Sequence, residues 1–80
     1  MLTEYIEAAM RHAKYEILPE DGTYYGEIPE CPGVYSNEDT LEECRTVLRE
    51  VLEDWILLRT RNQSEIPVVG GVDINLAVPA

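Results

Sequence analysis

The run Tyr24–Trp55, YYGEIPECPGVYSNEDTLEECRTVLREVLEDW, carries most of the folding information in this 80-residue chain. Its first residues favour a β-strand, which Pro29 ends because proline has no amide hydrogen to donate to a sheet. Residues 31–33, Cys-Pro-Gly, turn the chain into a short third strand over 34–36. Thr40 and Glu43 then have the spacing of a capping box, and an amphipathic helix follows. The run therefore predicts strand, turn, strand and helix in that order.

Upstream of this run, the apolar residues of 3–12 recur at the spacing of one helix face, with Thr3 as the N-cap. The period then changes to two and predicts a strand over 13–18. Residues 19–22, Pro-Glu-Asp-Gly, are a strong turn signal, because proline fixes one φ angle and glycine accepts a positive one. We therefore expect an antiparallel hairpin between 13–18 and the β-forming residues of 23–28.

The main helix is expected over residues 41–61. Its apolar stripe is wide enough to pack on a sheet, and comprises Leu41, Cys44, Val47, Leu48, Val51, Leu52, Trp55, Ile56 and Leu58. The opposite face is acidic, with Glu42, Glu43, Glu50, Glu53 and Asp54. Leu57 falls on that acidic face and is an apolar residue that the core does not explain. Arg49 and Glu53 are expected to form an i,i+4 ion pair.

Beyond the helix, apolar residues alternate with others over 72–78 and predict a last strand. The chain is thus a single α+β domain: an N-terminal helix over 1–12, a three-stranded meander over 13–36, the main helix over 40–61 and the strand over 72–78. We expect a small antiparallel sheet (β-β-β-α-β) with the long helix packed on one face.

The chain carries 16 acidic and 6 basic residues, for a formal charge of −10. Such a charge argues against nucleic acid or anionic membranes as direct partners and favours encounter with a basic one. Cys31 and Cys44 form no CxxC pair, and a secreted domain this small usually carries several disulfides. We therefore expect free thiols and a cytoplasmic protein, since neither a signal peptide nor a membrane-spanning apolar run is visible.

Catalytic chemistry is sparse. His12 is the sole histidine, and without a second histidine or a serine-acid set beside it we expect no nucleophile relay within one chain. The carboxylates Glu50, Glu53 and Asp54 indicate a solvated helix face rather than a cation site, because no calcium-type loop accompanies them. A relic nuclease would need convergent carboxylates, and Glu16, Glu27 and Asp73 on the strands are not expected to converge. We predict a protein that is not an enzyme and that holds neither metal nor cofactor.

Contact with another macromolecule is the remaining kind of function. Tyr24 and Tyr25 alternate across the sheet, so at most one of them packs under the helix. The other is an exposed aromatic residue, a type enriched in protein interfaces. The candidate partner-binding residues are Tyr24, Tyr25, Glu42, Glu43, Glu50, Glu53, Asp54 and Leu57.

Three segments, Tyr24–Pro29, Gly33–Tyr35 and Asp39–Glu43, make this chain similar to the HicB-type antitoxins. Those proteins carry the pattern YYAxIPxLPGxxxxGDTLEEA, followed by a long helix, in their N-terminal domains. The Ile-Pro link, the glycine four residues after that proline and the Thr-Leu-Glu-Glu cap fall in register with it. The resemblance covers about residues 13–58.

The resemblance implies a partly eroded ribonuclease-H-like or double-stranded-RNA-binding-like fold. It also implies that the chain neutralises a small basic HicA-like toxin, which cleaves messenger RNA, by binding it and masking its active site. A homodimer or higher oligomer is implied as well. Only 14 residues follow Ile66, too few for the DNA-binding module that many members add, so direct DNA binding is not expected. An orphan, self-associating scaffold protein of the same fold stays open as the alternative.

Overall fold

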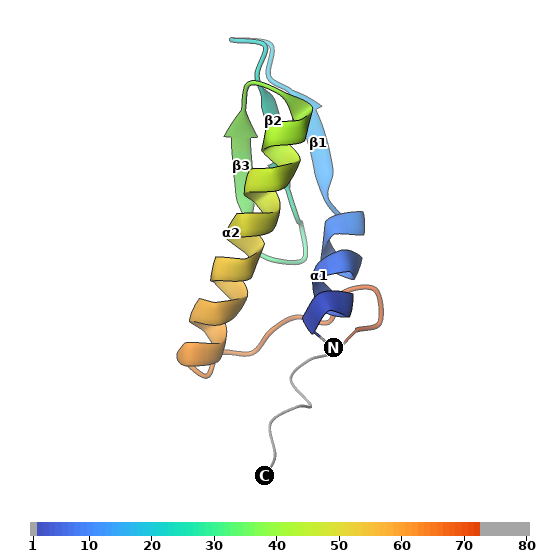
Figure 1. Cartoon of the computed structure of the whole chain (residues 1–80), viewed down its shortest axis with the longest axis vertical. Helices are drawn as coiled ribbons and strands as arrows, with labels where there is room; N and C mark the ends of the chain where they lie inside the picture. Colours follow the sequence, from blue (N-terminus) through green and yellow to red (C-terminus); the bar gives the residue numbers. More distant parts are fainter. Residues whose placement is uncertain (1, 73–80) are drawn as a thin grey trace.

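A computed structural model describes residues 2–72, which follow the order helix, three strands, helix (Figure 1). The elements are α1 (Leu2–Arg11), β1 (Lys14–Ile17), β2 (Tyr24–Glu27), β3 (Tyr35–Glu38) and α2 (Leu41–Arg61). The expected α+β class is confirmed, and the boundaries of the first four elements move by only one or two residues. The strand expected over 72–78 lies outside the described residues, apart from Val72, which forms an isolated bridge with Val69.

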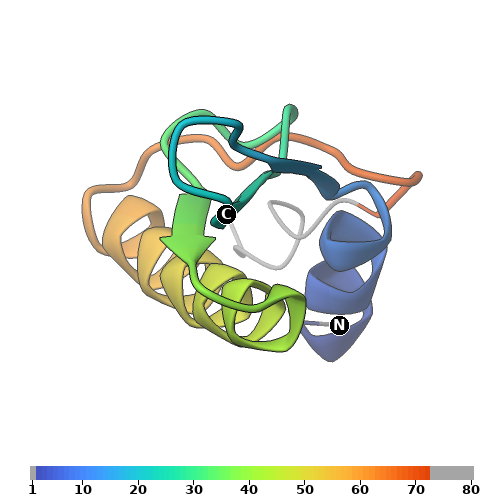
Figure 2. The same cartoon turned by 90° about the horizontal axis from the view of Figure 1, so that it is seen from above.

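The three strands form an antiparallel sheet in the order β1-β2-β3. Figure 2 shows both helices on the same side of this sheet. The turn from β1 to β2 is closed by hydrogen bonds from the amides of Gly22 and Thr23 to Leu18 O and the Asp21 carboxylate, at 2.8 and 3.0 Å. Gly22 has a φ of +72°, the left-handed conformation that the predicted turn requires of glycine.

The α2 helix begins where the capping box predicts. The Glu43 amide donates a hydrogen bond to Thr40 Oγ1 at 3.1 Å, and the Thr40 hydroxyl donates to the Glu43 carboxylate at 3.1 Å. The expected i,i+4 pair between Arg49 and Glu53 is present at 3.7 Å on the exposed surface. At the other end, Asn62 caps the helix and Gln63 turns the chain with a φ of +58°.

The buried stripe of α2 is narrower than the sequence predicts. The buried positions lie four residues apart, at Cys44, Leu48, Leu52 and Ile56, whereas Leu41 and Leu58 are 47% and 55% exposed. The prediction that Leu41 and Leu58 belong to the core stripe is wrong. Strands of four residues span about 13 Å and the helix is about 30 Å long, so the sheet supports only part of α2.

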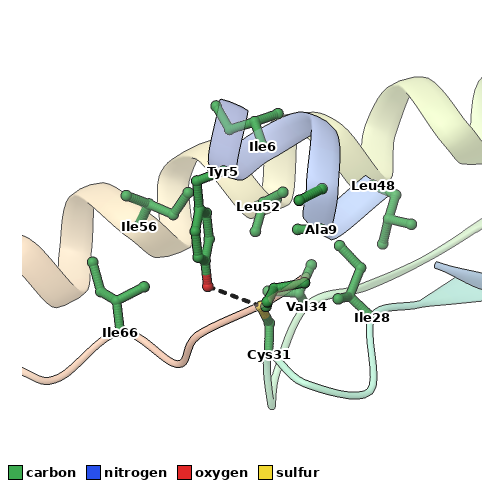
Figure 3. Close-up of a cluster of buried hydrophobic side chains, with 12 residues drawn as sticks. Tyr5, Ile6, Ala9, Ile28, Cys31, Val34, Leu48, Leu52, Ile56 and Ile66 are labelled. Carbon is green, nitrogen blue, oxygen red and sulfur yellow. Dashed lines mark hydrogen bonds between the residues drawn. The ribbon is translucent and has the colours of Figure 1, made fainter. Parts of the chain in front are cut away.

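A second part of the core continues beyond the end of the sheet. Here α1, the C-terminal half of α2, the Ile28–Val34 turn and the segment after α2 enclose one apolar cluster (Figure 3). Figure 1 shows that last segment running from the end of α2 back toward α1. Tyr5, Ile6, Ala8 and Ala9 are the contribution of α1. The N-terminal helix therefore closes the core that α2 and the sheet leave open.

One buried hydrogen-bond network joins these distant segments. The Tyr5 hydroxyl donates to Pro67 O at 2.7 Å, which uses its single hydrogen. Cys31 Sγ lies 3.8 Å from the same hydroxyl oxygen, so the thiol is the donor in that contact. Burial raises the pKa of Tyr5 far above its ordinary value, with a further contribution from the hydrogen bond to Cys31. Both groups therefore stay protonated at neutral pH.

Candidate partner-binding surfaces

The first candidate surface is an acidic strip along the solvent side of α2. Residues 43, 50, 54 and 57 recur at spacings of seven, four and three, so they lie above one another on one helix face. The first three turns of α2 and the end of β3 form a groove there, lined by Glu38, Glu42, Glu43, Thr46, Val47 and Glu50. Four carboxylates and no cation line this groove. The structure thus brings together three of the predicted residues, Glu42, Glu43 and Glu50.

The strip continues toward the C-terminal end of α2. Glu53, Asp54 and Leu57 are all exposed there, and Leu57 has 63% of its surface accessible. The prediction that Leu57 is an apolar residue outside the core is confirmed. An exposed leucine beside carboxylates gives the strip an apolar end that a partner could desolvate. We refer to the groove residues with Glu53, Asp54 and Leu57 as the acidic strip.

The second surface is the side of the sheet that faces away from both helices. Tyr25 and Tyr35 stack there with ring centroids 6.2 Å apart, and the Tyr25 hydroxyl donates to the Glu27 carboxylate at 3.1 Å. Their strands pair so that Tyr25 and Tyr35 are diagonal neighbours, which lets the rings meet. Tyr35 is 58% exposed. Sequence reasoning did not select Tyr35, although the strand register would have placed it beside Tyr25.

Tyr24 does not join this surface. A β-carbon on its strand neighbour Gly26 would lie 3.1 Å from Cys44 Sγ of α2, so Gly26 faces the helices. Strand alternation puts Tyr24 on that same side, where it is half-buried. The tyrosine that packs against the core from the sheet is instead Tyr15 on β1. The two neighbouring candidates, Tyr24 and Tyr25, are therefore separated by the sheet.

A third surface was missed by the sequence analysis. A groove between α1, β1 and the first half of α2 is lined by Glu7, Met10, Arg11, Ala13, Tyr15, Arg45 and Arg49. We call it the arginine groove. The available signal was the i,i+4 spacing of Arg45 and Arg49, which puts both on one side of α2. That Arg11 joins them depends on how α1 packs beside α2, which no local pattern reveals.

The two cysteines and His12 make packing and hydrogen-bond contacts within the fold. Cys31 and Cys44 are both free and buried, and burial raises the pKa of the Cys31 thiol. Cys44 accepts through its backbone carbonyl a 2.8 Å hydrogen bond from the Ser36 hydroxyl, which ties β3 to α2. His12 Nδ1 lies 2.9 Å from a Glu30 carboxylate oxygen. That hydrogen bond holds the pKa of Glu30 below its ordinary value.

Within residues 2–72, no group of three or more histidine, cysteine or acidic side chains is placed to hold a metal ion. Glu16 and Glu27 lie on the open side of the sheet, in adjacent pleats, and Asp73 is outside the described residues. Over the same described range, neither helix has the length and apolar composition needed to cross a membrane.

Comparison with known proteins agrees with this architecture. A crystal structure of TTHA0281 from Thermus thermophilus superimposes with a TM-score of 0.89 at 40% sequence identity, covering 99% of this chain and 95% of that one. No curated protein matches the sequence. Residues 4–67 match the family described as UPF0150-like. The chain belongs to the UPF0150-like family.

Proposed function

We propose that this protein is a HicB-like antitoxin that binds a small basic HicA-type toxin and neutralises it by covering its mRNA-cleaving site. The acidic strip on α2 is the observation that carries the proposal. It joins exposed carboxylates to the exposed Leu57 on a rigid helix, as a basic protein partner requires. The Tyr24–Trp55 run, with its resemblance to the HicB pattern, supports the same assignment.

Electrostatics explains how such a surface would work. The formal charge of −10 attracts a cationic protein from beyond contact distance, and the strip concentrates that charge on one helix. Complementary charges raise association rates above about 10⁶ M⁻¹s⁻¹ and fix the orientation of the partner. We place this activity in the cytoplasm, in keeping with two unpaired thiols, and we propose no catalytic turnover by the antitoxin itself.

The test is co-expression with a small basic HicA-type protein, followed by kinetic measurement of the purified pair. Glu50→Lys is the informative variant, because Glu50 is exposed and lies in the strip. Glu20→Lys is the matched control, since it changes the net charge equally but lies in the β1–β2 turn. We expect Glu50→Lys to slow association at least about tenfold, and Glu20→Lys to change it less than about twofold. Unrelieved toxicity without any isolable complex would refute the antitoxin role.

The alternative is an orphan scaffold protein of this fold that associates with itself. It is favoured by the stacked Tyr25–Tyr35 pair on the open side of the sheet and by edge strands β1 and β3, each of which pairs with one described strand only. Unpaired strand edges and exposed aromatic residues both promote association. Sedimentation velocity at micromolar concentrations tests the self-association: Tyr35→Lys should shift assemblies to monomers, whereas monomers of the unaltered protein would exclude the scaffold.

A further inference from the structure

The arginine groove concentrates positive charge on a strongly acidic protein. Arg11 comes from the last turn of α1, and Arg45 and Arg49 come from successive turns of α2, which α1 flanks (Figure 1). These are three of the six basic residues in the chain. With Glu7, the lining carries a formal charge of +2, whereas the whole chain carries −10. General solubility does not explain such local clustering of like charges.

Two of the three guanidinium groups of the groove have no protein partner among residues 2–72. Among the described residues, Arg11 and Arg45 make no hydrogen bond or ion pair, and Arg49 has only the 3.7 Å contact with Glu53. Arg59 is different: it donates to Glu65 O at 2.9 Å and lies over the Trp55 ring. The chain has 16 acidic side chains, yet two arginines of this groove pair with none of them. Their guanidinium hydrogen-bond donors are therefore available to an anionic ligand.

The remaining lining of the groove suits a ligand with an apolar part. The α2 helix packs over β2 and β3, so the helix-facing side of β1 is left partly open, and Ile17 on that side is 59% exposed. Tyr15 lines the groove from β1, and Met10 and Ala13 add apolar surface. Burial raises the pKa of the Tyr15 phenol, so its hydroxyl stays a neutral hydrogen-bond donor.

We propose that the arginine groove binds the phosphate group of a small phosphomonoester. Three guanidinium groups and one carboxylate match the charge of a phosphate dianion, whereas a single carboxylate ligand would neutralise only half of that charge. Arginine pairs with phosphate oxygens through parallel hydrogen bonds, which adds geometric selectivity. The ligand is small, because the charge of the surrounding surface repels a long polyanion such as RNA.

Phenyl phosphate is the probe, and benzoate at equal ionic strength is its carboxylate counterpart. Titration calorimetry of the full chain should show that phenyl phosphate binds at least about tenfold more tightly than benzoate, because the phosphate group accepts more charge-assisted hydrogen bonds. Binding should weaken as the pH falls below about 6, where the phosphate becomes a monoanion. Equal affinity for benzoate, or the absence of this pH dependence, would overturn the assignment to phosphate.

Two variants localise the site. Arg45→Gln should weaken phenyl phosphate binding about tenfold, the equivalent of one lost charged hydrogen bond. Arg61→Gln removes the same charge at the exposed end of α2, outside the groove, and should change affinity less than about twofold. Equal losses in both variants would mean a diffuse charge effect and would refute the site. Tighter binding of a 5′-phosphorylated RNA oligomer than of phenyl phosphate would refute a small ligand.

Discussion

Tyr5→Phe tests whether one hydroxyl ties the two ends of the described chain together. The substitution removes a single oxygen from a side chain with no exposed surface and keeps the ring in place. It leaves the Pro67 carbonyl, now bonded at 2.7 Å, and the Cys31 thiol without their partner. Leaving buried polar groups unsatisfied costs about 1–3 kcal/mol, and we expect a loss of about 2 kcal/mol in unfolding free energy.

That loss is large for a chain of this size, whose total stability is about 4–12 kcal/mol at the usual energy per residue. It corresponds to a melting temperature lowered by about 10 °C. Urea titration followed by circular dichroism measures it directly. Tyr35→Phe is the control: Tyr35 is 58% exposed, its hydroxyl has no hydrogen bond among the described residues, and its ring remains to stack on Tyr25.

The local effect is equally specific. Hydrogen exchange at the Val69 amide, which donates to Val72 O at 3.3 Å, should quicken in Tyr5→Phe because the segment loses its tether to α1. Equal stabilities for Tyr5→Phe and Tyr35→Phe would refute the idea that this hydroxyl holds the segment against the core.

Three further predictions concern single contacts. Gly26→Ala should lower the free energy of unfolding by about 1–3 kcal/mol, because the added carbon would lie 2.8 Å from the Tyr15 ring. An unchanged urea midpoint of unfolding would contradict this packing. Thr40→Ala removes the helix cap and should lower the free energy of unfolding by about 1 kcal/mol, whereas Thr46→Ala on the exposed face of α2 should leave it nearly unchanged. The pKa of Glu30 is lowered in the folded protein, so its contribution to stability is present above the unfolded pKa of 4.5 and is lost as the pH falls through the folded pKa. In Glu30→Gln, the free energy of unfolding should therefore fall less steeply with decreasing pH below 4.5. The same pH dependence in both proteins would show that the His12 contact does not stabilise the fold.

The sequence was a good guide to local structure and a poorer guide to surfaces. Turns at Gly22 and Gly33 and the cap at Thr40 lie where the residue types predict, because each depends on bonds within a few residues. The exposure of Leu41 and Leu58 was missed, because it depends on how the other elements pack around α2. The helical acids were placed together correctly, since helical periodicity alone puts them on one face.

Composition and near-neighbour spacing were enough to predict the order of the elements from α1 to α2 and the acidic face of α2. Three contacts emerged only once the chain was folded: Tyr35 meets Tyr25, Tyr5 reaches Pro67, and Arg11 joins the arginines of α2. These contacts join residues far apart in the chain, and their geometry is set by strand register and helix packing. Local residue patterns determine strand register only in part and helix packing not at all.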